Sequence, residues 1–260
     1  MRHRTKMAIV CGVAVLAGIA CRLGLNVVHY DIESDKITAP VKIAFLSDVH
    51  NSLYGKGQSE LITAISEFGT DIVLFGGDLF DEHNGEGNSW ALVDALAGEY
   101  PCFYTVGNHE YKTRIPEHYK DEMAGHGVTV LDDETEVVEI NGQKIRICGT
   151  EFHSDKNAVS QLDDLYSIDM HHFPEDFPIM KKKGFDLILA GHAHGGQWRI
   201  PYLVNGIYAP GEGFLPKYAG GYYSENGTEM IVSRGLYKNL SCLFIPRVFN
   251  RPELVLITLK

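Results

Sequence analysis

The stretch LILAGHAHGG, residues 187–196, joins an apolar run of strand type directly to two histidines and three glycines. Three upstream stretches share this arrangement: VKIAFLSDVH (41–50), IVLFGGD (72–78) and FYTVGNHE (103–110). In each, apolar and β-branched residues typical of a buried strand end at side chains that bind metal ions. Because ligand sites in open α/β sheets form beyond the carboxyl ends of the strands, we expect the four ends to converge.

The segments between these runs carry apolar residues at helical spacing, in residues 61–68 and 90–97. Alternation of strand and helix predicts a layered α/β domain with largely parallel strand pairing. Val137–Ile140 and Lys144–Cys148 flank the dipeptide Asn141-Gly142. This pattern predicts a β-hairpin with a type I′ turn, which needs positive φ at both central residues.

The carboxyl-terminal part contains two more runs of strand type, Met230–Ser233 and Leu254–Leu259. Residues 205–227, which precede them, are rich in Gly, Tyr and Pro and predict a long ordered loop. The aromatic residues of this stretch could form a packed core of the loop itself, which is the favoured interpretation, or could line an apolar substrate groove or touch lipid. These residues are Tyr208, Phe214, Tyr218, Tyr222 and Tyr223.

The polar residues at the four strand ends suit a metal centre. Asp48 and His50 are two residues apart and can bend toward one ion, whereas the two oxygens of Asp78 can bridge two ions. Mixed nitrogen and oxygen ligation suits first-row cations such as Mn²⁺, Fe and Zn²⁺ better than Ca²⁺. Any one of these residues alone is usually a turn residue, a helix cap or a hydrogen-bonded histidine. Their joint order therefore carries the prediction.

Asp-x-His, Gly-Asp, Gly-Asn-His-Glu and Gly-His-x-His, in this order, resemble the calcineurin-like metallophosphoesterase superfamily over roughly residues 41–260. The resemblance implies an α/β fold, a four-layer α-β-β-α sandwich in which helices flank two packed mixed sheets. It also implies two divalent metal ions, Mn, Fe, Zn or Co, that bridge a hydroxide which attacks phosphorus. The first metal would be held by Asp48, His50 and His194, the second by Asn108, His172 and His192, and Asp78 would bridge both.

The remaining assignments also follow from the resemblance. His172 is preferred as a ligand because Pro174 gives the His-x-Pro context, with His171 as the alternative and His153 as a more distant one. The catalytic residues would be His109, as general acid or charge stabiliser, and Glu110, which would orient it. Relatives often carry Arg after the position of Asp81, but this chain has Glu82. Arg199 is the candidate that would replace the missing positive charge.

The sequences GHAHGGQWRIP (191–201), VSRGL (232–236) and NRPE (250–253) resemble a membrane-associated bacterial branch of the superfamily. That kind of branch includes UDP-diacylglucosamine pyrophosphatases. The expected substrate is therefore a phosphorylated small molecule or lipid, a phosphodiester or pyrophosphate at the membrane. The alternatives are a nucleotide or protein phosphatase, or a catalytically silent metal-binding scaffold.

Charge is distributed unevenly along the chain. Lys and Arg number 23 against 34 Asp and Glu, and the net charge of −11 argues against a general nucleic-acid partner. Residues 1–30 contain no acid, and an uncharged run from Met7 to Cys21 extends to Val28 if Arg22 lies near the interface. We expect an N-terminal apolar helix in 1–30 (signal anchor or cleaved signal peptide), a linker in 31–40, and a phosphoesterase domain in 41–260. That domain would be extracytoplasmic, and secreted after cleavage; a buried core helix is the remaining interpretation of residues 1–30.

Overall fold

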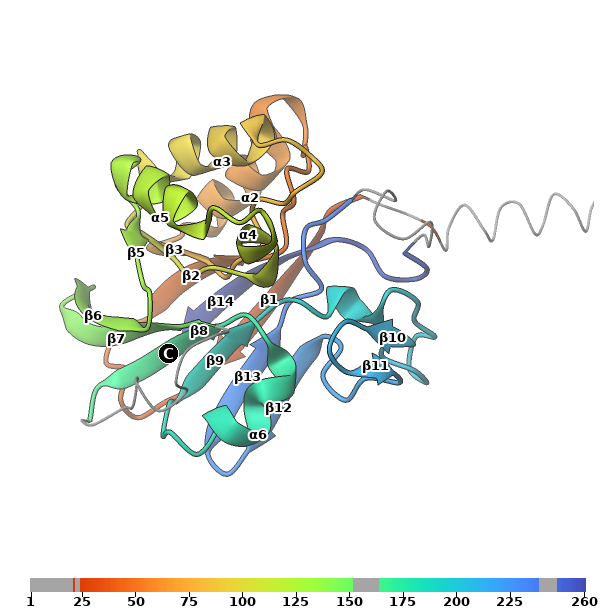
Figure 1. Cartoon of the computed structure of the whole chain (residues 1–260). Coiled ribbons are helices and arrows are strands. Elements are labelled where there is room, and N and C mark those ends of the chain that lie inside the picture. Colours follow the sequence, from red (N-terminus) through yellow and green to blue (C-terminus); the bar gives the residue numbers. More distant parts are fainter. Residues whose placement is uncertain (1–20, 22–23, 152–163, 239–246) are drawn as a thin grey trace, which may run out of the picture.

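The computed structural model describes residue 21 and residues 24–151, 164–238 and 247–260. Two six-stranded mixed sheets form its centre (Figure 1). The first has the order β1 (Asn26–Ile32), β14 (Glu253–Leu259), β2 (Val41–Leu46), β3 (Ile72–Phe75), β4 (Cys102–Tyr104), β5 (Thr129–Val130). The second has the order β12 (Gly221–Glu225), β13 (Thr228–Val232), β9 (Leu187–Ala190), β8 (Tyr166–His171), β7 (Gln143–Thr150), β6 (Glu134–Ile140). A separate pair consists of β10 (Tyr208–Ala209) and β11 (Gly213–Phe214).

Parallel pairing dominates the middle of both sheets. Strands β2, β3, β4 and β5 are parallel to one another, and so are β7, β8, β9 and β13. The antiparallel pairs are β14 with β2, β6 with β7 and β12 with β13. Parallel neighbours end at the same edge of a sheet, so the loops after β2, β3 and β4 lie together, as do those after β8 and β9.

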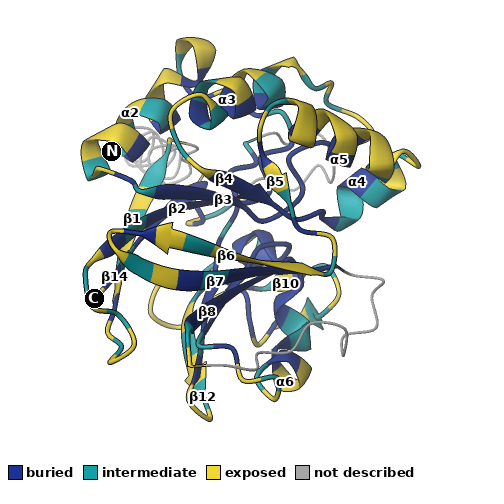
Figure 2. Cartoon of the chain, turned by 90° about the vertical axis from the view of Figure 1, so that its left-hand side faces the viewer, coloured by how far each residue is buried: buried dark blue, intermediate teal, exposed yellow. Residues whose placement is uncertain are grey.

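Three apolar clusters fill the spaces between the layers. Leu74 of the first sheet and Ile168 of the second belong to the cluster between the sheets. The outer face of the first sheet is covered by α2 (Ser59–Phe68), α3 (Gly87–Ala97), α4 (Asn108–Lys112) and α5 (Pro116–Gly125) (Figure 1). The third cluster lies outside the second sheet, beneath the short helix α6 (Phe177–Met180). Figure 2 shows the buried strands between these exposed outer surfaces.

The sequence-based elements agree closely with these bounds. β2, β3 and β9 have the predicted residues, and β4 begins at Cys102, one residue before the predicted start. The predicted hairpin is formed by β6 and β7, in which Ile140 pairs with Gln143. Asn141 and Gly142 both have positive φ, 52° and 77°, as a type I′ turn requires. The prediction of two packed mixed sheets is confirmed, but the helical layer outside the second sheet is thin in the described residues.

The amino-terminal boundaries differ from those expected. Asn26–Ile32 form β1, which pairs in parallel with β14 from Asn26↔Glu253 to Ile32↔Leu259. An apolar helix that reaches Val28, and a linker that begins at residue 31, are therefore both wrong. The physical reason is that β14 offers β1 a full backbone ladder, which the local sequence does not reveal. Most of the predicted helix, residues 1–20 and 22–23, lies outside the described residues. Within the described part of the chain, no helix has the length and apolar character to cross a membrane.

Candidate metal centre

The four predicted clusters meet at one end of the two sheets. Asp48 and His50 follow β2, Asp78 follows β3, and Asn108 begins α4 after β4. The second sheet contributes residues beyond β8 and β9: His172, His192 and His194. The structure thus brings together side chains from both sheets, across nearly 150 residues of sequence.

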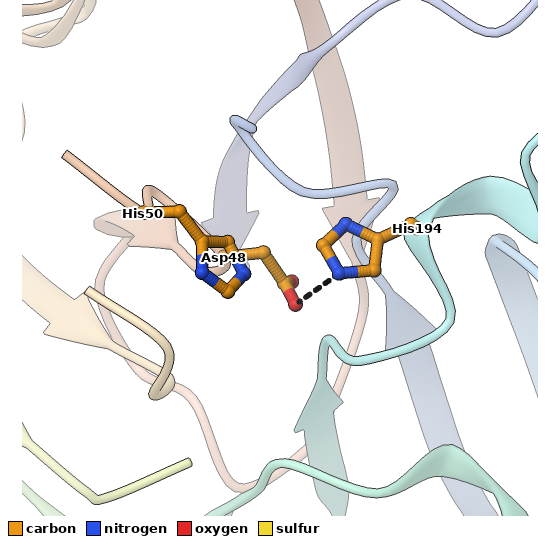
Figure 3. Close-up of side chains that lie close together, drawn as sticks. All are labelled: Asp48, His50 and His194. Atoms are coloured by element: carbon orange, nitrogen blue, oxygen red, sulfur yellow. Dashed lines mark ion pairs between the residues drawn. The ribbon is translucent and has the colours of Figure 1, made fainter. Parts of the chain in front are cut away.

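The carboxylates of Asp48 and Asp78 lie among the imidazoles. His194 Nε2 is 3.6 Å from Asp48 Oδ1, the contact drawn in Figure 3. His50 Nε2 is 3.7 Å from Asp78 Oδ2, and His172 Nε2 is 3.2 Å from that oxygen. Among the residues that the structure describes, three groups have ligand atoms within 4.8 Å of one another: Asp48, His50 and His194; His50, Asp78 and His109; Asp78, His172 and His192. Each of these groups is a candidate metal-binding set.

Several buried ligand atoms at this point have no hydrogen-bond partner among the described residues. They are His50 Nε2, Asp78 Oδ2, Asn108 Oδ1 and His172 Nε2. An unsatisfied buried polar atom costs free energy, so four of them facing one small region need an explanation. Coordination of cations would satisfy all four, and the donor set of imidazole, carboxylate and amide oxygen suits first-row divalent metals. The residues therefore fit a metal centre.

The backbone at the centre is held in an uncommon conformation. Positive φ values occur at Asp48 (53°), His50 (44°), Asp78 (55°), His192 (62°) and His194 (46°). Residues other than glycine rarely adopt this left-handed backbone conformation. It persists where the surrounding structure enforces it, as at active sites. These turns let the side chains bend from the strand ends toward one another.

Two glycines make the close approach of the turns possible. A Cβ on Gly107 would overlap the Asp78 carboxylate, and a Cβ on Gly191 would overlap the Ser47 hydroxyl. Both glycines directly precede candidate ligands, Asn108 and His192. Only glycine fits at these two positions, because the segments that follow different strands pass too close for a Cβ atom.

Neighbouring groups fix the orientation of the histidines. His50 Nδ1 is 3.1 Å from Asp81 Oδ2, and His172 Nδ1 is 2.7 Å from the carbonyl oxygen of Gly76. The Asn250 amide donates to the carbonyl of His194 at 2.6 Å. Metal-ligating imidazoles commonly have such partners at the other ring nitrogen, which sets the tautomer. Asp81 and Asn250 are thus positioned to support the centre.

The electrostatics of the metal-free histidines differ within the cluster. Burial lowers the pKa of His192 to about 3, aided by the charge of His172. Burial also lowers the pKa of His172, but the carboxylates of Asp78 and Asp48 outweigh it and raise the pKa to about 10. A metal ligand must be neutral imidazole. His192 is therefore ready to bind a cation, whereas binding at His172 would release a proton.

The two adjacent histidines at the end of β8 have different surroundings. His172 faces the cluster, as described above. His171 Nδ1 instead lies 3.0 Å from the carbonyl oxygen of Thr150, and its Nε2 lies 2.9 Å from Asp176 Oδ2. Successive residues of a strand point to opposite faces, so only one of the pair can reach the centre. The geometry places His172, and not His171, beside Asp78.

Glu110 does not orient His109, contrary to the role expected of it. Its buried carboxylate accepts hydrogen bonds from the backbone N–H groups of Asp78 (3.0 Å), Leu79 (2.7 Å), Phe80 (3.1 Å) and Gly107 (2.9 Å). A side chain of α4 therefore holds the turn after β3 in place. This correction arises because α4 turns residue 110 inward, away from the exposed side on which His109 lies.

His109 is oriented by Glu82. Its Nδ1 lies 2.9 Å from Glu82 Oε2, and its Nε2 lies 3.1 Å from Lys112 Nζ. In a neutral imidazole one nitrogen donates and the other accepts, so Nδ1–H donates to Glu82 and Nε2 accepts from Lys112. Burial raises the pKa of Glu82, but hydrogen bonds from the backbone and from His109 outweigh it and lower the pKa below its usual value. Where relatives often carry an arginine, this chain thus has a carboxylate that holds the histidine.

Two cations other than Arg199 contact histidines of the centre. Arg199 Nε itself donates to the carbonyl of Asn205, and its role at the phosphate stays a prediction. Lys112 lies against His109, and the buried Arg247 has Nη2 3.4 Å from His194 Nδ1. The sequence analysis missed both because neither belongs to a motif; for Lys112, its position three residues after His109 on one helix was the available signal.

This chain resembles known proteins both in sequence and in fold. The sequence pattern of the Calcineurin-like phosphoesterase family matches residues 41–196, which include every candidate ligand. The chain belongs to the calcineurin-like phosphoesterase family. "Phosphodiesterase YaeI" of Escherichia coli is 28% identical over 230 residues, with 85% of this chain and 83% of YaeI covered. "Uncharacterized metallophosphoesterase YkuE" of Bacillus subtilis is 30% identical over 240 residues, covering 84% and 79%.

The fold of this phosphoesterase also occurs among solved structures. The Haemophilus influenzae NAD nucleotidase NadN superposes with a TM-score of 0.51 at 14% identity, covering 76% of this chain and 46% of NadN. At that identity the likeness concerns the fold alone. The family and its curated relatives identify this phosphoesterase as a hydrolase that acts on phosphoesters.

Proposed function

We propose that this phosphoesterase uses two divalent cations to hydrolyse a phosphodiester or pyrophosphate substrate at a membrane surface. The observation that carries the proposal is a set of four buried ligand-type atoms without hydrogen-bond partners in the described chain: His50 Nε2, Asp78 Oδ2, Asn108 Oδ1 and His172 Nε2. The similarity to a protein named as a phosphodiesterase supports the diester. A catalytically silent scaffold is disfavoured because the sequence has a ligand-type residue at each predicted position.

In this proposal each cation has its own set of protein ligands. One would be held by Asp48, His50 and His194, the other by Asn108, His172 and His192, and both by Asp78. When bound, such cations (Mn, Fe, Zn or Co) activate water as a nucleophile and stabilise negative charge on phosphoryl oxygens. The sets share the Asp78 carboxylate, whose charge would offset repulsion between the cations.

His109, as an acid, and Lys112, as a cation, would act on the side of the centre that faces the substrate. The His109 side chain is 17% exposed, whereas those of Asp48 and Asp78 are fully buried, so His109 lies toward the solvent. Glu82 accepts from Nδ1–H, so His109 would act as the acid in its doubly protonated form, in which Nε2–H, turned from Lys112 to the substrate, would give its proton to the leaving oxygen. Lys112 adds positive charge beside it. General acid catalysis of this kind contributes roughly 10²–10⁴-fold to a rate.

The membrane part of the proposal rests on the sequence. The residues before β1, which include the uncharged run from Met7 to Cys21, would anchor the chain, with the basic end inside and the domain extracytoplasmic, or would be cleaved to release it. The tail motifs favour a lipid-linked substrate such as UDP-diacylglucosamine. In the structure, the motif residue Asn250 supports His194, and Arg234 pairs with Glu253 at 2.5 Å. These contacts join the tail motifs to one another and to the turn of His194.

A nucleotide as substrate is the second candidate, and one observation favours it. A cavity of about 300 Å³ borders His50 and is lined by polar side chains that include Asn51, Asn84, Asn88 and Lys238. Such a cavity suits a polar group such as a sugar or base next to the phosphate. A protein phosphatase remains the other alternative in this class.

Metal-dependent hydrolysis tests the proposal. Purified full-length protein would be assayed on bis-p-nitrophenyl phosphate and on the monoester, with Mn²⁺ and with chelator. We expect chelator-sensitive activity with the diester preferred; a preference for the monoester would favour the phosphatase alternatives. Absence of metal-dependent activity on either substrate would refute the proposal in favour of a scaffold.

A matched pair of variants tests the ligand set. His172→Gln should lower bound metal, measured by elemental analysis, and activity. His171→Gln, at the adjacent buried position, should leave metal content close to that of the unaltered protein. Equal metal loss in both variants would show that damage to β8, and not ligation, is the cause; thermal melting of each variant checks its folding.

A further inference from the structure

Large apolar side chains gather in the open on the loop that follows the metal-binding turn. Tyr202 (107%), Leu203 (82%), Phe214 (80%) and Leu215 (69%) are the most exposed large hydrophobic residues of the described chain. With Ile200 (46%) and Phe249 (44%) they form what we call the apolar loop patch. Single exposed apolar residues are ordinary, but several of them on one loop indicate an interaction surface.

The patch is one structured unit. Leu215 N donates to Ile207 O, and Ile207 N donates to Trp198 O. Trp198 forms a parallel β-bridge with Val248, which precedes Phe249. The Phe214 ring packs edge-on against Tyr208 across the β10–β11 pair, at 5.4 Å. Figure 1 shows this pair projecting from the edge of the molecule, away from α2, α3 and α5.

The backbone holds these side chains outward against its own preference. Tyr202, Leu215 and Phe249 have φ of 68°, 55° and 51°. Bulky residues rarely adopt the left-handed region, and such a conformation persists where the surrounding structure enforces it. The packed-core interpretation therefore holds for Tyr218, which is 2% exposed, and is wrong for Phe214.

The apolar loop patch has two neighbours in the fold, Gly24 near the start of the described chain and the metal-binding turn. Arg251, two residues after Phe249, donates to the carbonyls of Gly24 (3.0 Å) and Leu25. Gly24, which follows the apolar segment 7–21 by three residues in the sequence, therefore lies beside Arg251. The patch also continues directly from His194–Gly196, and Asn250 joins Gln197 to the turn of His194.

The composition of the loop indicates the kind of surface. Residues 197–216 contain one basic residue, Arg199, and one acidic residue, Glu212, within a chain of net charge −11. A partner recognised through charge is therefore disfavoured. Anionic headgroups would not increase the affinity of this loop for a membrane. Aromatic and aliphatic side chains without net charge suit the boundary between headgroups and acyl chains, which peripheral segments enter by about 5–10 Å.

We propose that the apolar loop patch inserts into a lipid bilayer beside the amino-terminal segment and thereby seats the metal centre at the headgroup level. The inference rests on the membrane placement in the proposed function, and it does not rest on hydrolysis. Insertion of the patch would explain why polar side chains line one side of the centre and apolar side chains the other. The polar cavity beside His50 can take a headgroup while the apolar part of a substrate stays in the bilayer.

Tryptophan fluorescence in full-length protein tests the insertion. The chain has two tryptophans, Trp198 at the patch and Trp90 in α3, where Trp90 packs on Phe80. Trp90→Phe isolates the patch signal, and Trp198→Phe provides the matched control. In phosphatidylcholine vesicles that contain brominated acyl chains, we expect quenching of Trp198 to exceed that of Trp90 about fivefold, with little dependence on anionic lipid or salt.

Charged substitutions then separate the patch from the anchor. Leu203→Glu with Phe214→Glu, in the Trp90→Phe chain, should reduce quenching to the level of Trp90, although flotation still finds the protein on vesicles. Unchanged quenching would overturn the proposal. Protection of Trp198 from both bromolipid and aqueous iodide would also overturn it, because the chain's own segment 7–21 or a second copy would then cover the patch.

The readout is independent of the proposed reaction. Absent quenching with intact metal-dependent hydrolysis would refute insertion alone. Strong quenching in a protein without hydrolysis would refute the proposed reaction alone.

Discussion

Glu110→Gln tests how the metal-bridging turn is held. Glu110 Oε1 accepts from the N–H groups of Leu79 and Phe80, and Oε2 accepts from those of Asp78 and Gly107. A glutamine amide nitrogen cannot accept, so two of the four buried donors lose their acceptor. Each such loss costs about 1–3 kcal/mol, so the free energy of unfolding should fall by about 2–6 kcal/mol. That is a large share of the roughly 5–15 kcal/mol that stabilises a typical domain.

Urea denaturation of the metal-free protein measures this change, with the slope of the transition checked for constancy. Glu99→Gln, at an exposed position, removes the same charge without a buried acceptor and should change stability by less than about 0.5 kcal/mol. Metal affinity should fall together with stability, because the displaced turn carries Asp78. A stable Glu110→Gln protein that had lost only turnover would refute this reasoning and restore the role of Glu110 as a partner of His109.

Three further changes have separate readouts. Asp78→Asn should lower kcat on bis-p-nitrophenyl phosphate by about 10³-fold or more and reduce bound metal in elemental analysis, because a charge between two cations is lost; wild-type turnover with full metal content would contradict the ligand assignment. Glu82→Gln should lower kcat about tenfold with KM and metal content unchanged, and Glu82→Asp should restore part of it, because the carboxylate orients His109; an effect on KM alone would point to substrate binding instead. Burial raises the pKa of Asp169 from 3.8 to about 6, so its ionisation opposes folding, and stability is lost as pH rises through this range. Asp169→Asn should therefore raise the unfolding free energy by up to about 3 kcal/mol at pH 8 and change it little at pH 4. Equal effects of the substitution in urea denaturation at both pH values would contradict the shift.

Much of the fold could be predicted from local sequence. The bounds of β2, β3 and β9 follow from continuous apolar runs, because a strand buried on both faces reads that way. The α2 helix and the β6–β7 hairpin follow from helical spacing and from Asn141-Gly142. In contrast, β1 reads as the end of an apolar segment or as linker, and only its ladder with β14, more than 200 residues later in the sequence, makes it a strand.

The sequence by itself determined the chemistry of the centre. Ligand-type residues at four strand ends, three of them directly preceded by glycine, name the candidate ligands, and parallel pairing within each sheet brings its strand ends together. His172 was favoured over His171 by one proline, and alternation along β8 gives the same choice in space.

The tertiary structure alone decided the partners around the ligands and the surface beside them. Glu110 faces inward to four backbone donors, Glu82 takes the place at His109, and Arg247 reaches His194 from a distant part of the chain. It also decided that Phe214 is exposed and Tyr218 buried, although both are aromatic residues of one loop. The physical reason is that residue type and periodicity record what a side chain can do, whereas its orientation and neighbours depend on contacts between residues far apart in sequence.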